Sequence, residues 1–395
     1  DLLCVERGVP MLGGTLDGNA SDKKNNNVML SKVSSFLARH GIKEEAFTYI
    51  ADSALVTPNN LAKLSKIRFA SRLPGTYNAC GKLIAKAVSE NSWEKLGQLA
   101  ELPSPASRPT SSYRAYEGTV KIDNVAYRAI VIHSDSHEKR VLKRIKKGKS
   151  KSKARLEKTL AKAHPEYDCD ADARVAAASL EALSDGIHDV RASVREKSVP
   201  SKGRPPKNGA RKMVSRFVVE TELAENSAGI QRMTEEAGCF VLLTNIPLAD
   251  GERRHPAAEI FKSYKGQYGV ESNFGFLKDP LIVNDLFLKK PSRIDVLGMV
   301  LIISLLVWRL MERNMRNYIA NTGRQLPGWN KGKTARPTAY MMKTKFHGIK
   351  VARIGAERRL LGKMRLEVSA YLEALGLDGE VFTTPGVKCK AILRV

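Results

Sequence analysis

The chain has 395 residues, which is long for one compact core, and 43% of them are hydrophobic, which excludes wholesale disorder. Its 66 Lys and Arg residues against 41 Asp and Glu residues give a formal charge of +25, which favours a polyanionic partner, nucleic acid before an anionic membrane surface, over a merely soluble basic protein. The five cysteines form no CxxC pair, which argues against a zinc site of the usual spacing or a disulfide framework and indicates a reducing cytoplasm.

The first 74 residues alternate short strands with helices, a pattern that indicates an α/β sheet. The expected elements are a hairpin over 2–16 turning at Arg7-Gly8, a helix over 28–40, a buried strand that ends before Asp52, a helix capped by Thr57 with Pro58 in its first turn, and a strand over 67–73. Asp52 therefore follows directly on a buried strand.

The pattern changes over 75–246, which we interpret as an insertion made partly of β-structure and partly of basic helix. Residues 119–133 predict a hairpin that turns near Asp123-Asn124, and strands are expected near 215–221 and 239–246. Residues 139–162 hold twelve Lys or Arg residues and one Glu. This stretch is either a surface that binds DNA phosphates or a solvated basic segment.

After residue 246 the sequence predicts helices over 257–278, 291–317 and 354–375, with a loop-rich stretch over 321–352. The apolar run 296–308 has thirteen residues, too short to span a bilayer, so it indicates a buried core helix and no membrane partner. The expected domains are a first core part over 1–74, an insertion over 75–246, a second core part over 247–320 and a C-terminal loop and helix region over 321–395.

Four polar side chains recur along the helix expected over 257–278. At about 100° per residue, the side chains fall in a stripe about 60° wide, beside an apolar face; they are Tyr264, Gln267, Glu271 and Lys278. They form either a solvated helix face or a group that converges on a ligand. Gly269 and Gly275 each weaken the helix by about 1 kcal/mol relative to Ala, which suggests that a backbone approaches closely. Asp279-Pro280 is expected to end the helix.

Tyr264-x2-Gln267-x3-Glu271-x6-Lys278 resembles the Tyr-x2-Arg-x3-Glu-x6-Lys signature of bacterial insertion-sequence DDE transposases, with Gln267 in place of the usual Arg. YIADSALVT, GVESNFGFLKDP and CFVLLTNIP also resemble that family. The resemblance covers most of the chain and is firmest over 9–75 and 239–345. It implies a ribonuclease-H-like catalytic core, interrupted by the insertion and followed by a helical C-terminal region.

The resemblance also implies a chemistry and partners. Asp52 matches the second catalytic aspartate and Glu271 the glutamate, both as ligands of a two-metal Mg²⁺ or Mn²⁺ site; Tyr264 and Lys278 match positions that touch DNA phosphate. Gln267 can hydrogen-bond a phosphate but carries no charge. Carboxylates suit such hard cations, and two ions can stabilise both the attacking and the leaving oxygen of a phosphodiester. The expected partners are the terminal repeats of the element, target DNA and a second subunit in a homodimer.

The first aspartate of the family lies on a strand that would precede Leu2. We therefore expect an N-terminally incomplete transposase whose fragment alone is nearly inactive, with Asp17 or Asp22 as minor alternatives for the missing ligand. Two other functions stay open. One is a non-catalytic DNA-binding remnant, and the other is a ribonuclease-H-like nuclease.

Three weaker motifs have ordinary alternatives that we favour or weigh equally. HSDSH, with His133, Asp135 and His137, is expected in a surface loop rather than at a metal site. KGRPPK at 202–207 resembles the core of an AT-hook but is expected to be a linker. Lys331, Lys333 and Arg336 are either phosphate contacts or part of an ordinary loop.

Overall fold

The computed structural model describes residues 2–5, 8–43, 46–99, 110–164, 166–201, 212–278 and 288–384. The chain divides into two compact units, unit 1 with Asp1–Met29 and Ser263–Val395, and unit 2 with Leu30–Lys262. KGRPPK and Asp279-Pro280 lie outside the described residues.

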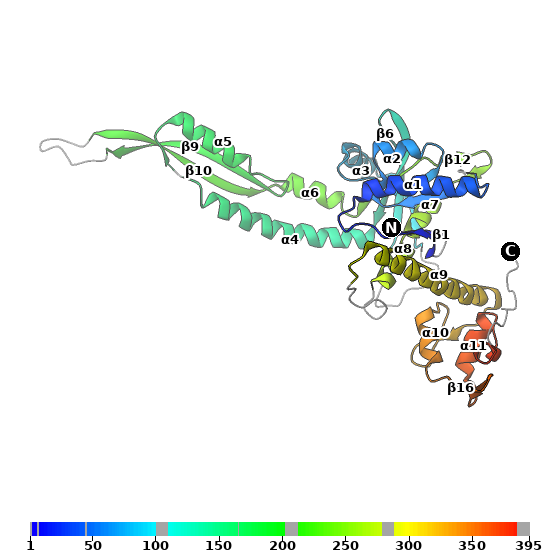
Figure 1. Cartoon of the computed structure of the whole chain (residues 1–395). Coiled ribbons are helices and arrows are strands. Elements are labelled where there is room, and N and C mark those ends of the chain that lie inside the picture. The colour runs from blue at the N-terminus through cyan, green and yellow to red at the C-terminus, as the bar shows by residue number, and fades with distance from the viewer. Residues whose placement is uncertain are drawn as a thin grey trace. The chain divides into compact units, whose positions relative to one another are not determined.

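Unit 2 is built on a six-stranded mixed sheet, which confirms the expected α/β class (Figure 1). Its strands, in the order in which they lie, are β3 (Thr48–Ala51), β4 (Arg68–Arg72), β11 (Cys239–Thr244), β7 (Val125–Ser134), β6 (Tyr113–Ile122) and β5 (Glu94–Gly97). β3 and β4 are parallel, and the other neighbours are antiparallel. The sheet thus joins strands of the expected first core part with strands of the expected insertion.

Local sequence signals in unit 2 form as predicted. The Thr57 hydroxyl accepts a hydrogen bond from the Asn60 amide (3.3 Å), with Pro58 in the first helical position. Asp123 and Asn124 take left-handed φ values of 47° and 64°, so they make the tight turn between β6 and β7. The helices of the sheet region are α1 (Asp22–Arg39), which extends into unit 1, α2 (Pro58–Lys63), α3 (Asn78–Glu90) and α7 (Ala257–Lys265). A short hairpin pairs β12 (Ala249–Asp250) with β13 (Arg253–Arg254).

The core of unit 2 lies on this sheet and is held by the half-buried polar side chain of Asn245 as well as by apolar packing. Phe69, Ile130 and Leu242 have no exposed surface. The Asn245 amide donates to the carbonyl oxygens of Leu64 (3.1 Å) and Ile67 (2.8 Å), which fastens the turn before β4 to the end of β11.

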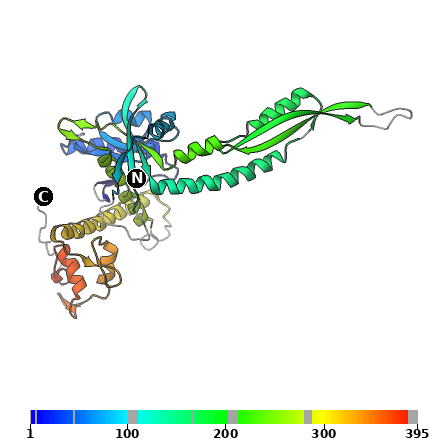
Figure 2. The same ribbon diagram turned by 180° about the vertical axis from the view of Figure 1, so that it is seen from behind.

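A second part of unit 2, which we call the arm, comprises residues 135–235. It contains α4 (Asp135–Leu160), β8 (Glu166–Tyr167), α5 (Asp170–Glu181), β9 (His188–Pro200), β10 (Met213–Glu225) and α6 (Ser227–Glu235). In Figures 1 and 2, α4 leaves the sheet and runs beside the long ribbon of β9 and β10, whose thirteen residues each pair throughout. α5 packs on this ribbon through Ala173 and Ala177, which lie in one buried cluster with Val219 of β10.

A polar cluster fastens α4 to the base of the ribbon. Ser152 donates to Asp185 (2.6 Å) and accepts from His188 Nδ1 (2.9 Å), and Arg155 pairs with Asp185 (2.8 Å). Burial opposes ionisation of Asp185. Hydrogen bonds from Ser152, from the backbone amides of His188 and Ile187, and from Arg155 outweigh it and lower the pKa of Asp185 to about 2.

Unit 1 begins with the expected hairpin, β1 (Leu2–Val5) paired antiparallel with β2 (Val9–Gly13). The single helix expected over 257–278 is wrong, because α7 ends at Lys265 and α8 (Tyr268–Leu277) begins three residues later. At the break, Gly266 and Gln267 donate to carbonyl oxygens three residues back, Ser263 (3.0 Å) and Tyr264 (3.2 Å), as in a tight turn.

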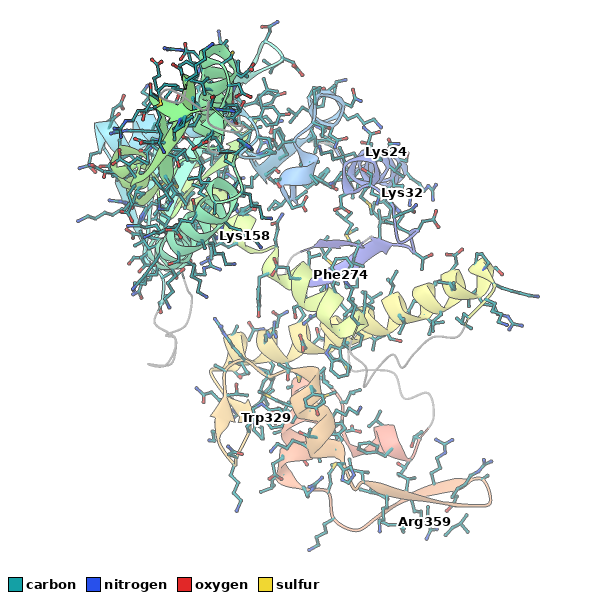
Figure 3. The ribbon with its side chains drawn as sticks, turned by 90° about the vertical axis from the view of Figure 1, so that its left-hand side faces the viewer. Lys24, Lys32, Lys158, Phe274, Trp329 and Arg359 are labelled. Atoms are coloured by element: carbon teal, nitrogen blue, oxygen red, sulfur yellow. The ribbon has the colours of Figure 1, made fainter. Side chains whose placement is uncertain are left out.

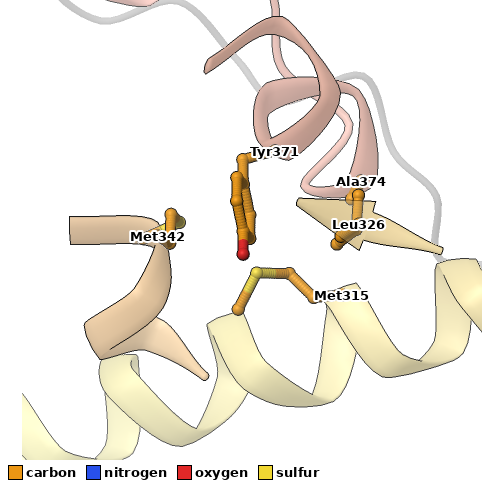
Figure 4. Close-up of a cluster of buried hydrophobic side chains, with 5 residues drawn as sticks. All are labelled: Met315, Leu326, Met342, Tyr371 and Ala374. Carbon is orange, nitrogen blue, oxygen red and sulfur yellow. The ribbon is translucent and has the colours of Figure 1, made fainter. Parts of the chain in front are cut away.

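The C-terminal part of unit 1 packs on the end of α9 (Pro291–Thr322). Its elements are β14 (Leu326–Pro327), β15 (Lys333–Thr334), α10 (Ala339–Phe346), β16 (Lys350–Ile354), β17 (Glu357–Leu361) and α11 (Leu366–Ala374). Figure 4 shows Tyr371 of α11 surrounded by its buried partners, which are Met315, Leu326, Met342 and Ala374. The helix expected over 354–375 is wrong in its first half, where Gly355, at φ 62°, turns a hairpin.

The apolar run of α9 is not a buried core helix, which corrects that expectation. Val296, Met299 and Val307 are 58%, 57% and 51% exposed, whereas Leu305 is fully buried. Apolar side chains occur all around the helix, and within the described residues the buried ones, Leu305 and Met315, lie toward one side of it. Among the described residues, α9 is the one helix long and apolar enough to cross a membrane. Length and composition alone are weak evidence of membrane association, because core helices of soluble proteins share them.

The four cysteines in the described ranges are free thiols. Burial raises the pKa of Cys4 and Cys80, and that of Cys239 to about 11. Cys169 is exposed at the start of α5, where its Sγ accepts from the Asp172 amide (3.5 Å).

Candidate metal and nucleic-acid site

Asp52 lies at the carboxyl end of β3, where the chain leaves the sheet. Its side chain is exposed, and Oδ1 accepts a hydrogen bond from the Ala54 amide (3.0 Å), which caps a short 3-10 turn. Its carbonyl oxygen accepts from the Ser71 hydroxyl (2.7 Å). Ser71 belongs to the parallel neighbour β4 and is fully buried. The backbone of Asp52 is therefore held by the sheet, while its carboxylate faces solvent.

Asp52 shares this end of the sheet with a cation and an aromatic phenol. Arg72, the last residue of β4, lies over the ring of Phe240 at 5.2 Å. Burial, reinforced by the charge of Asp52, raises the pKa of Tyr49 to about 12, so this phenol stays neutral at physiological pH.

Glu271 lies in the first turn of α8, with its side chain exposed. Because the helix breaks at Gly266, the expected stripe is divided between two elements. Tyr264 belongs to α7 and Gln267 to the turn, both half-buried, and Lys278 follows α8. Two turns of helix separate Glu271 from Lys278, so these two point to similar sides. Lys278 Nζ lies 6.0 Å from the ring of Phe274.

Asn273, which the sequence did not single out, orients α8. It is fully buried, and its amide donates to the Gly8 carbonyl oxygen (2.6 Å) and to Cys4 Sγ (3.2 Å) in the β1–β2 hairpin. Two residues correspond to about 200° around a helix, so burial of Asn273 turns Glu271 outward. The sequence feature that could have indicated this role is an amide side chain on the apolar side of a predicted helix.

Arg309 of α9 completes this support. Its Nε donates to Asn273 Oδ1 (2.5 Å), its Nη2 to the Ser272 hydroxyl (2.9 Å) and its Nη1 to Glu312 (2.7 Å). Glu312 is 3% exposed and also accepts from the Ala339 amide (3.1 Å). A polar network thus connects α8, α9 and α10. In the sequence, this network is indicated by charged residues inside a helix that is otherwise expected to be apolar.

The backbones of the first hairpin and α8 approach closely. Gly8 has φ 74°, and a Cβ built on it would lie 3.2 Å from the Gly269 carbonyl oxygen. The expected close approach at Gly269 is therefore present, whereas a Cβ on Gly275 would meet nothing within 4 Å.

Asp52 belongs to unit 2 and Glu271 to unit 1, so their approach to a shared metal site stays a prediction. Asp17 and Asp22, the alternatives for the third ligand, are both exposed residues of unit 1. No group of three or more His, Cys, Asp or Glu side chains with metal-site spacing occurs within the ranges that the structure describes.

The HSDSH motif joins β7 to α4 and is not a surface loop, which corrects that expectation. Asp135 accepts from the Ser112 amide (3.1 Å), and the Ser134 hydroxyl caps α4. His133 is buried and lies 3.5 Å from Glu138. His137 faces the ring of Phe240 at 6.2 Å. These contacts anchor the first turn of α4 to the sheet.

The basic stretch 139–162 forms most of α4, with its charged side chains outward. Lys331 lies in the turn before β15 with φ 62°, Lys333 is in β15, and Arg336 follows it; their contact with phosphate stays a prediction.

Comparison with protein-family models gives no match, and comparison with curated proteins gives none either.

Proposed function

We propose that this chain is the catalytic part of a DNA transposase, a ribonuclease-H-like enzyme that cleaves the ends of an insertion sequence and joins them to target DNA. The observation that carries the proposal concerns two carboxylates. Asp52 and Glu271 both face solvent, while buried contacts hold the backbone beside each of them. Solvated surface carboxylates do not need such support, whereas metal ligands do.

The donor chemistry suits a hard divalent cation. Asp52 uses one carboxylate oxygen for the Ala54 amide and keeps the other available. The Glu271 carboxylate has no hydrogen bond or ion pair to any residue that the structure describes. These oxygens would hold Mg²⁺ or Mn²⁺. Two such ions, when bound, would supply Lewis-acid stabilisation of the attacking and leaving oxygens.

The neighbouring polar residues would bind and orient DNA. Lys278 would pair with a phosphate near the scissile bond, and Tyr264 and Gln267 would donate hydrogen bonds to phosphate oxygens. Arg72 supplies a fixed positive charge at the Asp52 end of the sheet.

A third carboxylate would have to reach the Asp52 end of the sheet. β3 is the edge strand of the described sheet, so its outer side is free to pair. A strand added there could bring an aspartate beside Asp52. We propose that the enzyme acts in the bacterial cytoplasm, as a homodimer on paired element ends.

The test uses the polypeptide encoded by the whole reading frame that contains these 395 residues. Its substrate is a labelled duplex of the genomic DNA that flanks this frame, with Mg²⁺. We expect Asp52→Asn and Glu271→Gln each to reduce strand cleavage and transfer at least 1,000-fold, because each removes a metal-binding charge. Asp123→Asn, in the exposed β6–β7 turn, is the matched control and should retain wild-type activity.

A change of metal ion distinguishes a loss of metal binding from a loss of folding. Asp52→Cys should be inactive with Mg²⁺ and partly active with Mn²⁺, because a thiolate binds the softer ion better. Wild-type activity of Asp52→Asn would refute the proposal. DNA binding without any cleavage would indicate a non-catalytic remnant, and cleavage without strand transfer would indicate a nuclease.

A further inference from the structure

We propose that the exposed face of α4 is a docking surface for the phosphate backbone of duplex DNA, and that it holds the DNA that flanks the site at Asp52. The inference rests on the proposed function for the location of that site. It rests on the arm itself for the binding surface. The surface comprises Lys139, Arg140, Lys143, Arg144, Lys146, Lys147, Lys151 and Lys158, all exposed.

These eight cations share one side of the helix. At about 100° per residue they fall within about half of its circumference. The opposite side carries Ile145, Ser152 and Leu156, which face the rest of the arm, the last two of them buried. None of the eight has an ion pair with a residue in the described ranges, whereas Lys149, Lys153 and Arg155, near the margins, pair with acidic residues. The charge of the face is therefore available to a ligand.

α4 is held at both ends, so its basic face keeps one orientation in unit 2. At its start, the Ser134 amide donates to the Gly238 carbonyl oxygen (3.1 Å), and a Cβ on Gly238 would lie 2.8 Å from Glu138 Cβ. Toward its end, the Asp185 cluster binds Ser152 and Arg155. A preorganised row of cations loses less entropy on binding than flexible lysines in a disordered tail.

The basic face begins at the end of the sheet that carries Asp52. Arg72 follows Ser71, which donates to the Asp52 carbonyl oxygen. Arg72 stacks on Phe240, which also contacts His137 in the first turn of α4. Burial and then the charges of Arg72, Arg140 and Arg144 lower the pKa of His137. Arg72, Arg140 and Arg144 thus bring positive charge to the first turn of α4, at the Asp52 end of the sheet.

The length of the face suits a duplex. Lys158, labelled in Figure 3, lies near the C-terminal end of α4. Nineteen residues of helix separate Lys139 from Lys158, a length of about 28 Å. This distance matches about eight base pairs at 3.4 Å each. The apolar residues of α4 point inward, so the face lacks the exposed apolar side chains with which interfacial helices enter a membrane.

The test measures binding of the full chain to a fluorescein-labelled 30-base-pair duplex of arbitrary sequence, with EDTA present so that cleavage plays no part. Lys143→Gln/Lys147→Gln removes two charges from the centre of the face. We expect affinity at 0.1 M salt to fall about tenfold or more, and the slope of log K against log salt to become shallower by about 2.

The matched control is Lys66→Gln/Lys121→Gln, two exposed lysines at the opposite end of the sheet. It should bind the duplex nearly as tightly as the wild type, and circular dichroism should be unchanged for both variants. Equal losses in the two double variants, or wild-type binding by Lys143→Gln/Lys147→Gln, would overturn the proposal. So would a loss of binding to phosphatidylserine vesicles without a loss of duplex binding. An active Asp52→Asn enzyme, in contrast, would refute the catalytic function and leave this surface in place.

Discussion

At the scale of single residues, Asn273 is the buried side chain on which the orientation of Glu271 depends. It connects a hairpin, α8 and Arg309 through both ends of one amide. Such groups are costly to remove, because the partners left behind are buried and lose their hydrogen bonds.

We expect Asn273→Ala to lower the free energy of unfolding by about 2–4 kcal/mol, because it leaves the Gly8 carbonyl oxygen and the Nε of Arg309 without their partner. Urea unfolding followed by tryptophan fluorescence measures the change. Asn314→Ala, at an exposed position of α9, is the control and should cost less than about 0.5 kcal/mol. Equal stability of the Asn273→Ala variant and the wild type would mean that the amide does not anchor α8.

At the scale of elements, the Asp185 cluster gives the arm a pH-dependent stability. The folded pKa of Asp185, about 2, lies below the ordinary value of 3.8. The ionised form is thus favoured by folding, and this stabilisation is present above about pH 4 and is lost as pH falls toward 2.

We therefore expect Asp185→Asn to destabilise the arm at pH 6 by about 1–3 kcal/mol, because hydrogen bonds to a charged acceptor are weakened. The difference from the wild type should shrink as pH falls from 4 to 2. Hydrogen exchange of the β9 and β10 amides measures both effects, with Asp123→Asn as the control. A difference that stays constant down to pH 2 would exclude a role of the ionised carboxylate.

The elements also indicate which features a sequence can predict. The hairpin turn at Asp123-Asn124 and the cap at Thr57 were predicted correctly, because each depends on residues a few positions apart. The break at Gly266 was missed because the polar period continues across it. The β16–β17 hairpin was missed because alternation around Gly355 also fits an amphipathic helix.

In the candidate site, too, the sequence predicts some features and not others. Exposure of Asp52 at a strand end follows from the local order of strand, polar break and helix. The supports of the site do not. Asn273 meets Gly8 across 265 positions, and no local pattern specifies such a partner. Likewise, charge predicted the basic character of α4, but only the fold reveals that α4 starts at the Asp52 end of the sheet.

At the scale of the whole molecule, the chain has two compact units with separate cores. The two carboxylates of the proposed metal site, Asp52 and Glu271, belong to different units.

We expect calorimetry to resolve two unfolding transitions, because each unit buries its own apolar residues. Asn273→Ala should lower the transition of unit 1, and Asp185→Asn that of unit 2. A single transition that both variants shift equally would show that the two units unfold cooperatively.

Because the thiols differ in their burial, a thiol reagent would label the arm selectively. A maleimide reacts with thiolate, and burial suppresses that form at Cys4, Cys80 and Cys239. Cys169, exposed on α5, is open to reagent. Once Cys389 is replaced by Ser, a fluorophore attached at Cys169 would label the arm at the start of α5 and report when the arm binds a partner.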